Sequence, residues 1–232
     1  MTDEQVDLRV ANSEAIHEAI RKTWGHPELL PLQEDAIQAR LEGRDSLVVL
    51  PTGGGKSLCY QVPPLLTGGT DVVVSPLIAL MKDQVDGLRA AGYPAAALHS
   101  NLTSEESAAA EKELMTGQLR LIYLAPERLM MPRTIEMLAR LPIRAVAVDE
   151  AHCISHWGHD FRPEYRMLAE LRERIPDLSV HGFTATATPR VREDIAAQLR
   201  LRDPQVLIGT FDRPNLTYRV VPRVDTGRQV AQ

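Results

Sequence analysis

Cysteine, aromatic residues and long apolar runs are all scarce in this sequence. Only two cysteines, Cys59 and Cys153, occur among 232 residues. A disulfide framework is therefore excluded as the basis of the fold, and a reducing cytosol is the simplest compartment. No apolar run reaches the length of about eighteen residues that a membrane span needs. The N-terminus, MTDEQVDLRV, is acidic and lacks the apolar core of a secretory signal, so we expect a cytoplasmic protein with no membrane partner.

A strong excess of charge of either sign is also missing. The formal net charge is −5, and charged residues make up 25% of the chain. This balance argues weakly against wholesale binding to a polyanion, but a local groove is still compatible with it, because phosphate contacts depend on where the cations lie. With 44% hydrophobic residues, the chain can bury a real core and suits one ordinary domain, or one large domain with appendages.

Short β-branched runs alternate with segments of helical period along the chain. We expect strands at 46–50, 71–75, 95–99, 120–124, 144–148, 179–183 and 205–209. We expect helices at 12–23, 77–91, 103–116, 133–140, 162–174 and 189–199, the third starting at Thr103 with Glu106 completing a capping box. This alternation predicts an α/β fold with a mostly parallel central sheet and helices on both faces.

A glycine-rich stretch, PTGGGKS, directly follows the first expected strand and opens a helix. Gly53, Gly54 and Gly55 let the backbone turn its N–H groups toward phosphates, and Lys56 reaches the terminal phosphates. Ser57 then supplies a hydroxyl ligand for Mg²⁺. The stretch is the T-G-x-G-K-S variant, which starts at Thr52 and has Leu50 where the strict pattern has glycine. The alternative is a turn that merely connects strand to helix.

Two adjacent acids, Asp149 and Glu150, follow the strand expected at 144–148. They therefore emerge at the carboxyl edge of the sheet, where open α/β sheets bind ligands. Asp149 is expected to contact Mg²⁺, and Glu150 to orient and deprotonate the attacking water. Alone, such a pair is commonplace on protein surfaces. Together with Lys56 and Ser57, it predicts a magnesium-dependent nucleoside triphosphatase.

Six stretches, in this order, resemble the motifs of the RecQ family of superfamily 2 DNA helicases. They are PTGGGKSLCYQVP, SPLIALMKDQ, YLAPERL, DEAHCISHWGHDFRPEY, TATAT and FDRPNL. The resemblance implies a RecA-like three-layer sandwich over residues 24–216, preceded by a helical extension at 1–23 and followed by a linker at 217–232. It also implies ATP and Mg²⁺ as cofactors, and 3′ to 5′ DNA unwinding in recombination and repair. Such a protein would associate with the nucleoid if bacterial.

The resemblance gives the loop after the acids a role in contacting single-stranded DNA and relaying that contact to the ATP site. By position, Trp157, Phe161 and Arg162 are its working residues. Aromatic rings offer faces on which bases stack without sequence preference, and arginine adds charge. The alternative is that the two rings belong to the core, against which Gly158 and Pro163 argue because they interrupt a regular apolar face.

The same loop contains four residues with metal-like spacing. They are His152, Cys153, His156 and His159. A zinc site usually closes with a second ligand pair, which is not evident here, so we expect no zinc in this chain. The family's zinc module lies in a C-terminal region that this sequence does not contain.

Other motif residues are assigned by position. Ser75 is expected to face a DNA phosphate, and Lys82 either adds charge there or is simply solvated. Thr184 and Thr186 are expected to couple hydrolysis to domain movement, although their hydroxyls alternatively cap the following helix. Arg128 either reaches DNA or pairs with the acid that precedes it.

The adenine-binding segment departs from the family pattern. Gln33 matches and is expected to hydrogen-bond the adenine edge, but His26 stands where the family usually has tyrosine and Leu30 where it usually has arginine. Imidazole still stacks, whereas leucine offers only apolar contact. We therefore expect ATP binding with weaker base discrimination than is typical.

A RecA-like motor needs a second RecA-like domain, in cis or in trans, whose arginines complete the ATP site. We find no sequence for it after residue 216, and we therefore expect this chain to be monomeric and to bind single-stranded and branched DNA, but to hydrolyse ATP poorly alone. Two alternatives remain open at this stage. One is an RNA helicase or remodeller of the same superfamily, and the other is a non-catalytic half-motor that binds nucleotide without turnover.

Overall fold

A computed structural model of the protein describes residues 3–129, 131–155, 157, 162–210 and 217. The strands are β1 (Ser46–Val49), β2 (Thr70–Val74), β3 (Ala95–Leu98), β4 (Leu121–Leu124), β5 (Ile143–Val148), β6 (Ser179–Thr184) and β7 (Gln205–Ile208). The helices are α1 (Asp3–Trp24), α2 (Gln33–Leu41), α3 (Lys56–Gln61), α4 (Pro63–Thr67), α5 (Ile78–Ala90), α6 (Ser104–Met115), α7 (Pro126–Leu129), α8 (Pro132–Ala139), α9 (Met167–Arg174) and α10 (Pro189–Gln198). Two short 3₁₀ helices, η1 (Ala151–Ile154) and η2 (Pro163–Arg166), lie between β5 and α9.

The strands form one sheet in the order β3-β4-β2-β5-β6-β1-β7, and every described pair is parallel. All seven strands lie within one residue of their expected bounds, so the α/β prediction is confirmed. Parallel pairing places the carboxyl ends of all strands at one edge of the sheet. The glycine loop after β1, the start of α5 after β2 and the acids after β5 therefore lie at the same edge.

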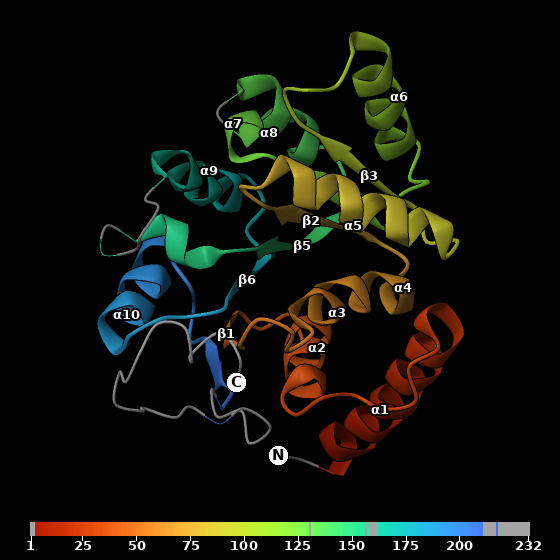
Figure 1. Ribbon diagram of the computed structural model, residues 1–232, viewed down its shortest axis with the longest axis vertical. Helices are drawn as coiled ribbons and strands as arrows, with labels where there is room; N and C mark the ends of the chain where they lie inside the picture. The colour runs from red at the N-terminus through yellow and green to blue at the C-terminus, as the bar shows by residue number, and fades with distance from the viewer. Residues whose placement is uncertain (1–2, 130, 156, 158–161, 211–216, 218–232) are drawn as a thin grey trace, which may run out of the picture.

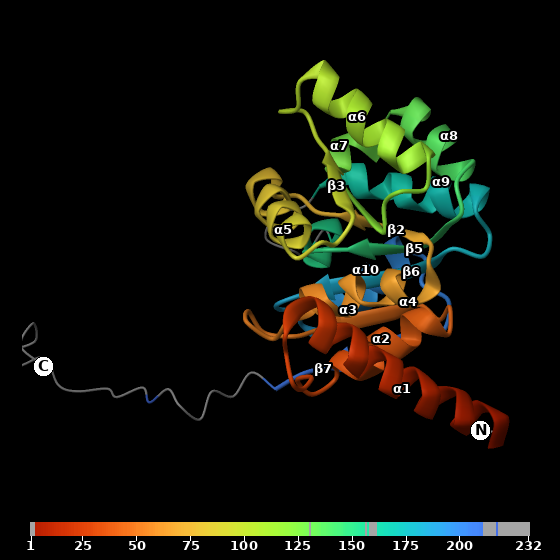
Figure 2. The same ribbon diagram turned by 90° about the vertical axis from the view of Figure 1, so that its right-hand side faces the viewer.

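Alternating strand residues build two separate core layers. Val49 of β1 and Val74 of β2 face the layer that contains residues of α6, α8, α9 and α10. Val48 and Val73 face the opposite layer, which contains residues of α2, α3 and α5. Near-continuous apolar strands are typical of sheets that are covered on both faces. The result is the three-layer sandwich, with α1 packed outside it against α2 and α4 (Figures 1 and 2).

The helix bounds agree less closely with the sequence than the strands do. The capping box is confirmed, because the Thr103 hydroxyl accepts the Glu106 N–H and the Glu106 carboxylate accepts the Thr103 N–H. In contrast, α1 begins at Asp3 rather than near residue 12, and α9 begins at Met167 because a 3₁₀ turn precedes it. Helices α2, α4 and α7 are not among the elements expected from the sequence.

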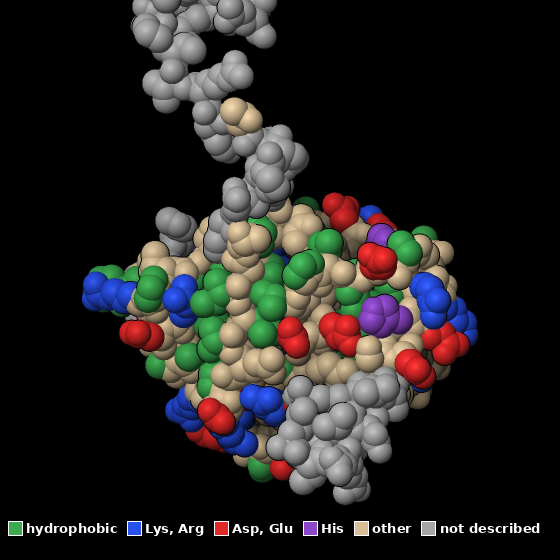
Figure 3. All heavy atoms as spheres, turned by 90° about the horizontal axis from the view of Figure 1, so that it is seen from below, with side chains coloured by type: hydrophobic (Ala, Val, Ile, Leu, Met, Phe, Trp, Pro, Cys, Tyr) green, Lys and Arg blue, Asp and Glu red, His purple; other side chains and the backbone are tan. Residues whose placement is uncertain are grey.

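The lower face of the molecule exposes hydrophobic side chains between acidic and basic groups (Figure 3). β7 is an edge strand of the sheet, and its Val206 and Ile208 side chains are 48% and 45% exposed. Within the described part of the chain, no helix has the length and apolar character needed to cross a bilayer.

Candidate functional site

The glycine loop between β1 and α3 has the backbone that its composition predicts. Gly53 and Gly55 lie in the left-handed region with φ values of 81° and 69°, where side chains other than glycine are strained. A Cβ atom at Gly54 would lie 2.9 Å from the Pro51 carbonyl oxygen. All three glycines are therefore required for this turn, and the loop delivers Lys56 and Ser57 to the first turn of α3.

Gln33, the first residue of α2, is buried and hydrogen-bonds to the glycine loop. Its Oε1 accepts the Leu30 N–H at 2.7 Å, and its Nε2 donates to the carbonyl oxygens of Gly55 at 3.0 Å and Gly54 at 3.5 Å. Its expected contact with adenine stays a prediction. Leu30 is 49% exposed and His26 is exposed on the same segment.

Lys56 lies between the glycine loop and the acids. Its ammonium donates to the Leu50 carbonyl oxygen at 3.2 Å. Its positive charge is among the smaller influences on both acids: it offsets part of the upward pKa shift that burial causes at Asp149, and it adds to the downward pKa shift that His152 causes at Glu150. The loop and the acid pair, about a hundred residues apart in sequence, are thus within electrostatic reach of one another.

The two adjacent carboxyl groups have opposite pKa shifts. Burial and then the neighbouring Glu150 charge raise the pKa of Asp149 to about 6, and its Oδ1 accepts the Glu150 N–H at 3.0 Å. The hydrogen bond from His152 lowers the pKa of Glu150 despite partial burial. Glu150 also has a left-handed backbone with φ of 49°, a conformation that is uncommon outside glycine and is found at functional sites.

His152 connects the acids to the end of β6, a role that the sequence analysis missed. Its Nδ1 lies 3.3 Å from Glu150 Oε2 and 3.0 Å from Thr184 Oγ1. Contacts with the Cys153 sulfur and with Glu150 raise the pKa of His152 to about 10. The Thr184 hydroxyl in turn donates to the Thr186 carbonyl oxygen at 3.1 Å. An imidazole two residues after a carboxylate that follows a strand is the sequence signal that could have identified this connection.

The alternative role of the two threonines as helix caps is wrong. The N-cap of α10 is Thr188, whose hydroxyl accepts the Val191 N–H at 3.4 Å. Thr184 is buried at the end of β6 and bonds to His152, whereas Thr186 is exposed. Their predicted coupling role is compatible with this arrangement but stays a prediction.

The residues expected to contact DNA after β2 are Ser75 and Lys82. Ser75 directly follows β2, and its buried hydroxyl has no hydrogen-bond partner in the described part of the chain. Lys82, on α5, is 70% exposed and forms an i,i+4 ion pair with Asp86 at 2.6 Å. Arg128 pairs with Glu111 of α6 at 2.9 Å rather than with its sequence neighbour.

Trp157 is the described aromatic residue of the loop that follows the acids. Its side chain is 58% exposed, which contradicts a core position, and the Arg190 guanidinium lies 3.4 Å from its ring centroid. The backbone N–H of Trp157 donates to Ser155 Oγ, which itself donates to Asp194 Oδ2 at 2.6 Å. Arg162 is partly buried, and its backbone N–H donates to the Cys153 carbonyl oxygen.

Three residues of this loop, Phe161, His156 and His159, lie outside the described residues. The same holds for the linker expected at 217–232, apart from residue 217. Within the ranges that the structure describes, no group of three or more histidine, cysteine or acidic side chains could hold a metal ion. The expectation of no zinc therefore stays a prediction.

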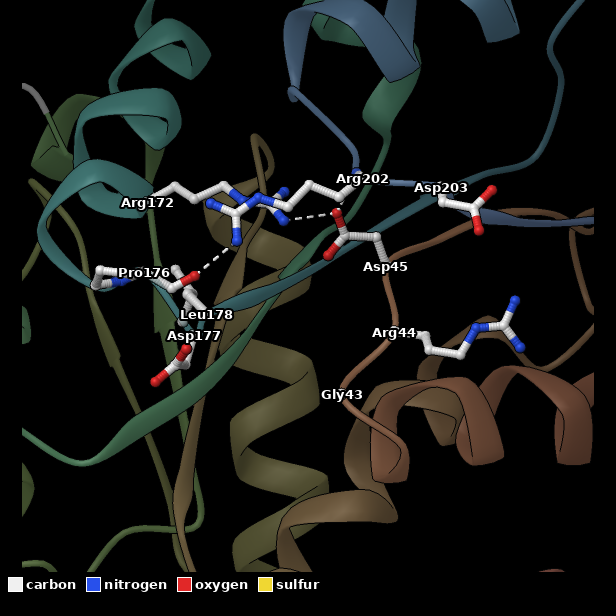
Figure 4. A pocket seen from close by; sticks show the side chains of 9 residues that line it. All are labelled: Gly43, Arg44, Asp45, Arg172, Pro176, Asp177, Leu178, Arg202 and Asp203. Carbon is white, nitrogen blue, oxygen red and sulfur yellow. Dashed lines mark hydrogen bonds and ion pairs between the residues drawn. The ribbon is translucent and has the colours of Figure 1, made fainter. Parts of the chain in front are cut away.

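A polar pocket lies at the opposite edge of the sheet, where β1, β6 and β7 begin (Figure 4). The Asp45 carboxylate accepts the backbone N–H of Val180 at 2.9 Å and the backbone N–H of Arg202 at 2.6 Å. It also forms an ion pair with the Arg172 guanidinium at 2.7 Å. These bonds join the segment before β1 to three other segments, so the pocket is a structural junction. It has no part in the glycine-loop site.

A family model described as DEAD/DEAH box helicase matches residues 30–195. The chain is 44% identical over 215 residues to the ATP-dependent DNA helicase RecQ of Pasteurella multocida, which covers 93% of this chain and 34% of that protein. It is 39% identical to the probable ATP-dependent DNA helicase RecS of Bacillus subtilis, over 93% of this chain and 43% of that protein. The chain thus spans about a third to less than half of the length of these curated relatives.

Solved structures share the fold at lower identity. The DEAD-box helicase Mss116, bound to single-stranded RNA and UDP-BeF, gives a TM-score of 0.67 at 20% identity, over 86% of this chain and 44% of that one. The DUF1998 helicase MrfA bound to DNA also gives 0.67 at 20% identity, over 84% of this chain and 29% of that one. The RecA-like fold expected from the motifs is therefore confirmed.

Proposed function

Because this chain belongs to the DEAD/DEAH box helicase family and is similar to RecQ DNA helicases, we propose that it is the N-terminal motor domain of an ATP-dependent 3′ to 5′ DNA helicase. Membership in the family implies the use of ATP. In this proposal, residues 24–216 form the motor domain, residues 1–23 a helical extension and residues 217–232 a linker to a second RecA-like domain. The whole protein acts on single-stranded and branched DNA in recombination and repair.

The observation that carries the proposal is the convergence of the glycine loop and the acid pair. Both lie at the carboxyl edge of the sheet, and the charge of Lys56 acts on Asp149 and on Glu150. The oxygen donors of Ser57 and Asp149 are the hard ligands that Mg²⁺ prefers. The donor set therefore fits a magnesium nucleotide, and the ion, when bound, would neutralise charge on the phosphate oxygens.

The chain's own residues divide the chemistry between them. The backbone N–H groups of the loop and Lys56 bind and orient the phosphates, and Gln33 holds the loop in place. Glu150 is the general base, because its lowered pKa keeps it ionised at neutral pH and able to accept a proton from water. His152, whose Nδ1 lies 3.3 Å from Glu150 Oε2, fixes the orientation of that carboxylate.

DNA contact is proposed for the same edge of the sheet. Ser75 and Lys82 would meet the phosphate backbone, while Trp157, Phe161 and Arg162 would stack on bases and report their presence to the acids. His152 and Thr184 support this route, because they lie between the acids and the end of β6. Thr184 and Thr186 would then pass the change to the second domain.

The first experiment measures binding of AMP-PNP, a non-hydrolysable ATP analogue, to the 232-residue chain in the presence of Mg²⁺. Lys56→Ala should weaken binding at least about tenfold, because it removes a charge-assisted contact to phosphate. Lys112→Ala, an exposed lysine of α6, is the matched control and should have no effect. If neither the chain nor a complex with a second domain binds the analogue, the proposed function is wrong.

The second experiment tests turnover and the choice of nucleic acid. The chain alone should hydrolyse ATP poorly and should not unwind a duplex, because the arginines of a second RecA-like domain are needed. ATPase activity should appear when that domain is added, and poly-dT should stimulate it more than poly-U. Strong duplex unwinding by the chain alone would contradict the need for a second domain. Greater stimulation by poly-U would favour an RNA helicase, and no activity on mixing would favour a non-catalytic module.

A further inference from the structure

A row of polar side chains lies in the apolar layer between the sheet and helices α3 and α5. Tyr60 and Gln61 come from α3, Tyr123 from β4 and Gln84 from α5. Tyr60, Gln61 and Tyr123 are only 5%, 4% and 1% exposed. Polar groups at such positions must find partners within the protein, because each unpaired one costs about 1–3 kcal/mol.

These side chains form a continuous connection from the candidate metal ligand to α5. At one end, the Tyr60 hydroxyl donates to Ser57 Oγ at 3.2 Å. The rings of Tyr60 and Tyr123 pack edge to face with centroids 6.5 Å apart, so the two side chains touch in the middle of the connection. At the other end, Gln61 Nε2 donates to the Tyr123 hydroxyl at 3.2 Å and to Gln84 Oε1 at 2.8 Å.

The position of this chain of bonds is informative. Its four members come from three of the motifs quoted above. Tyr60 and Gln61 belong to PTGGGKSLCYQVP, Gln84 to SPLIALMKDQ and Tyr123 to YLAPERL. The negative charge of Asp149 contributes to the raised pKa of Tyr60 and of Tyr123, after burial, so the hydroxyls lie within electrostatic reach of the acids. Phenylalanine would fill nearly the same volume without burying a hydroxyl. Packing alone therefore does not explain why both rings carry one.

We propose that Tyr60, Gln61 and Tyr123 are positioning residues that couple Ser57 to α5, so that DNA on α5 and magnesium nucleotide at Ser57 change each other's affinity. This inference rests on the proposed function, which places Ser57 on the metal and the start of α5 on DNA. Hydrogen bonds are directional, so a small shift of α5 that moves Gln84 must be followed by Gln61 and Tyr123. The close packing of the Tyr123 ring against the Tyr60 ring passes that shift on to Ser57. The resulting effect is reciprocal between the two ligands.

The test compares the Kd of the intact 232-residue chain for AMP-PNP with Mg²⁺, measured with and without saturating oligo-dT. The wild-type Kd should change by at least about fivefold when DNA is bound. Tyr123→Phe removes the central hydroxyl and keeps the ring, so this ratio should fall to within about twofold of unity. Tyr60→Phe should have the same effect. The double variant should have no further effect, because one break already interrupts the connection.

Tyr93→Phe is the matched control. Tyr93 lies in the same core layer, is 2% exposed, and donates its hydroxyl to the Gln61 carbonyl oxygen at 2.7 Å. This variant therefore removes an equally buried hydroxyl that does not lie between Ser57 and Gln84. Its coupling ratio should equal that of the wild type. Thermal unfolding of each variant confirms that it is folded.

The outcomes separate this inference from the proposed function. If the wild type binds both ligands without coupling, if Tyr123→Phe keeps the wild-type ratio, or if Tyr93→Phe loses as much, the inference is wrong and the proposed function stands. If the tyrosine variants do not fold, Gln84→Ala at the half-buried end of the connection decides in their place, by the same ratio. If neither the wild-type chain nor its complex with a second domain binds nucleotide, both are rejected.

Discussion

Asp149→Asn should make the ligand-free protein more stable while it removes magnesium-nucleotide binding. The Asp149 carboxyl is 7% exposed, and its pKa rises from 3.8 to about 6, chiefly through burial. A carboxyl whose folded pKa is raised contributes stability below its unfolded pKa, and that contribution is lost as the pH rises through the folded pKa. The ionised side chain thus opposes folding at neutral pH, and an uncharged side chain does not.

The magnitude follows from the two pKa values. One pKa unit corresponds to about 1.4 kcal/mol, so ionised Asp149 costs roughly 3 kcal/mol at about pH 7.5 and roughly 1.6 kcal/mol at about pH 5. Asparagine keeps the oxygen that accepts the Glu150 N–H. The variant should therefore exceed the wild type in free energy of unfolding by up to about 3 kcal/mol at the higher pH and by about half of that at the lower pH.

Urea denaturation of both proteins at the two pH values measures this difference. Asp177→Asn, at an exposed position, is the control and should change stability by less than about 0.5 kcal/mol at either pH. AMP-PNP binding with Mg²⁺ should be lost only in Asp149→Asn. An Asp149→Asn protein that is less stable than the wild type, or equally more stable at both pH values, would refute the reasoning.

Three further predictions concern the core and the base-binding segment. His181 is buried between the hydroxyls of Ser46 and Ser179, and burial lowers its pKa from 6.5 to about 3. Because the folded pKa of this histidine is depressed, the free energy of unfolding falls as the pH is lowered below about 6.5. This group alone should lower it by about 2 kcal/mol between pH 7.5 and pH 5, and urea titrations should show that His181→Gln lacks this pH dependence. Gln33→Ala leaves the carbonyl oxygens of the loop and the Leu30 N–H without their partner, so the Tm should be lower and AMP-PNP should bind about tenfold more weakly. A fluorescence titration measures this binding, and unchanged affinity would contradict the role of the Gln33 amide. Equilibrium binding should show less preference for ATP over GTP than is typical of RecQ helicases, and a strong adenine preference that Leu30→Ala abolishes would show that leucine is adequate there.

The sheet and the phosphate loop were predictable because their signals are local. β-branched runs such as 71–75 identify buried strands, and three consecutive glycines before Lys56 require a turn that few other sequences allow. The start of α6 was equally predictable, since both capping residues lie within one turn. In each case, the residues that determine the structure are neighbours in the chain.

Contacts between distant segments were less predictable. The partner of Arg128 is Glu111, from another helix, and the cap of α10 is Thr188 rather than either earlier threonine. The bonds of Gln33 to the glycine loop join residues that lie 22 positions apart. A choice among several acids or several hydroxyls depends on how helices pack, which no local pattern specifies.

The sequence by itself determined the parallel α/β fold, the glycine loop and the acid pair, because each follows from residue types at fixed short spacing. Only the tertiary structure decided that Lys56 lies near both acids, that His152 joins Glu150 to Thr184, and that Tyr60 bonds to Ser57 while its ring packs against Tyr123. The physical reason is that parallel strands bring their carboxyl ends to one edge whatever their separation in the chain. Side chains that meet there are selected by the strand order and by the packing of the helices between the strands.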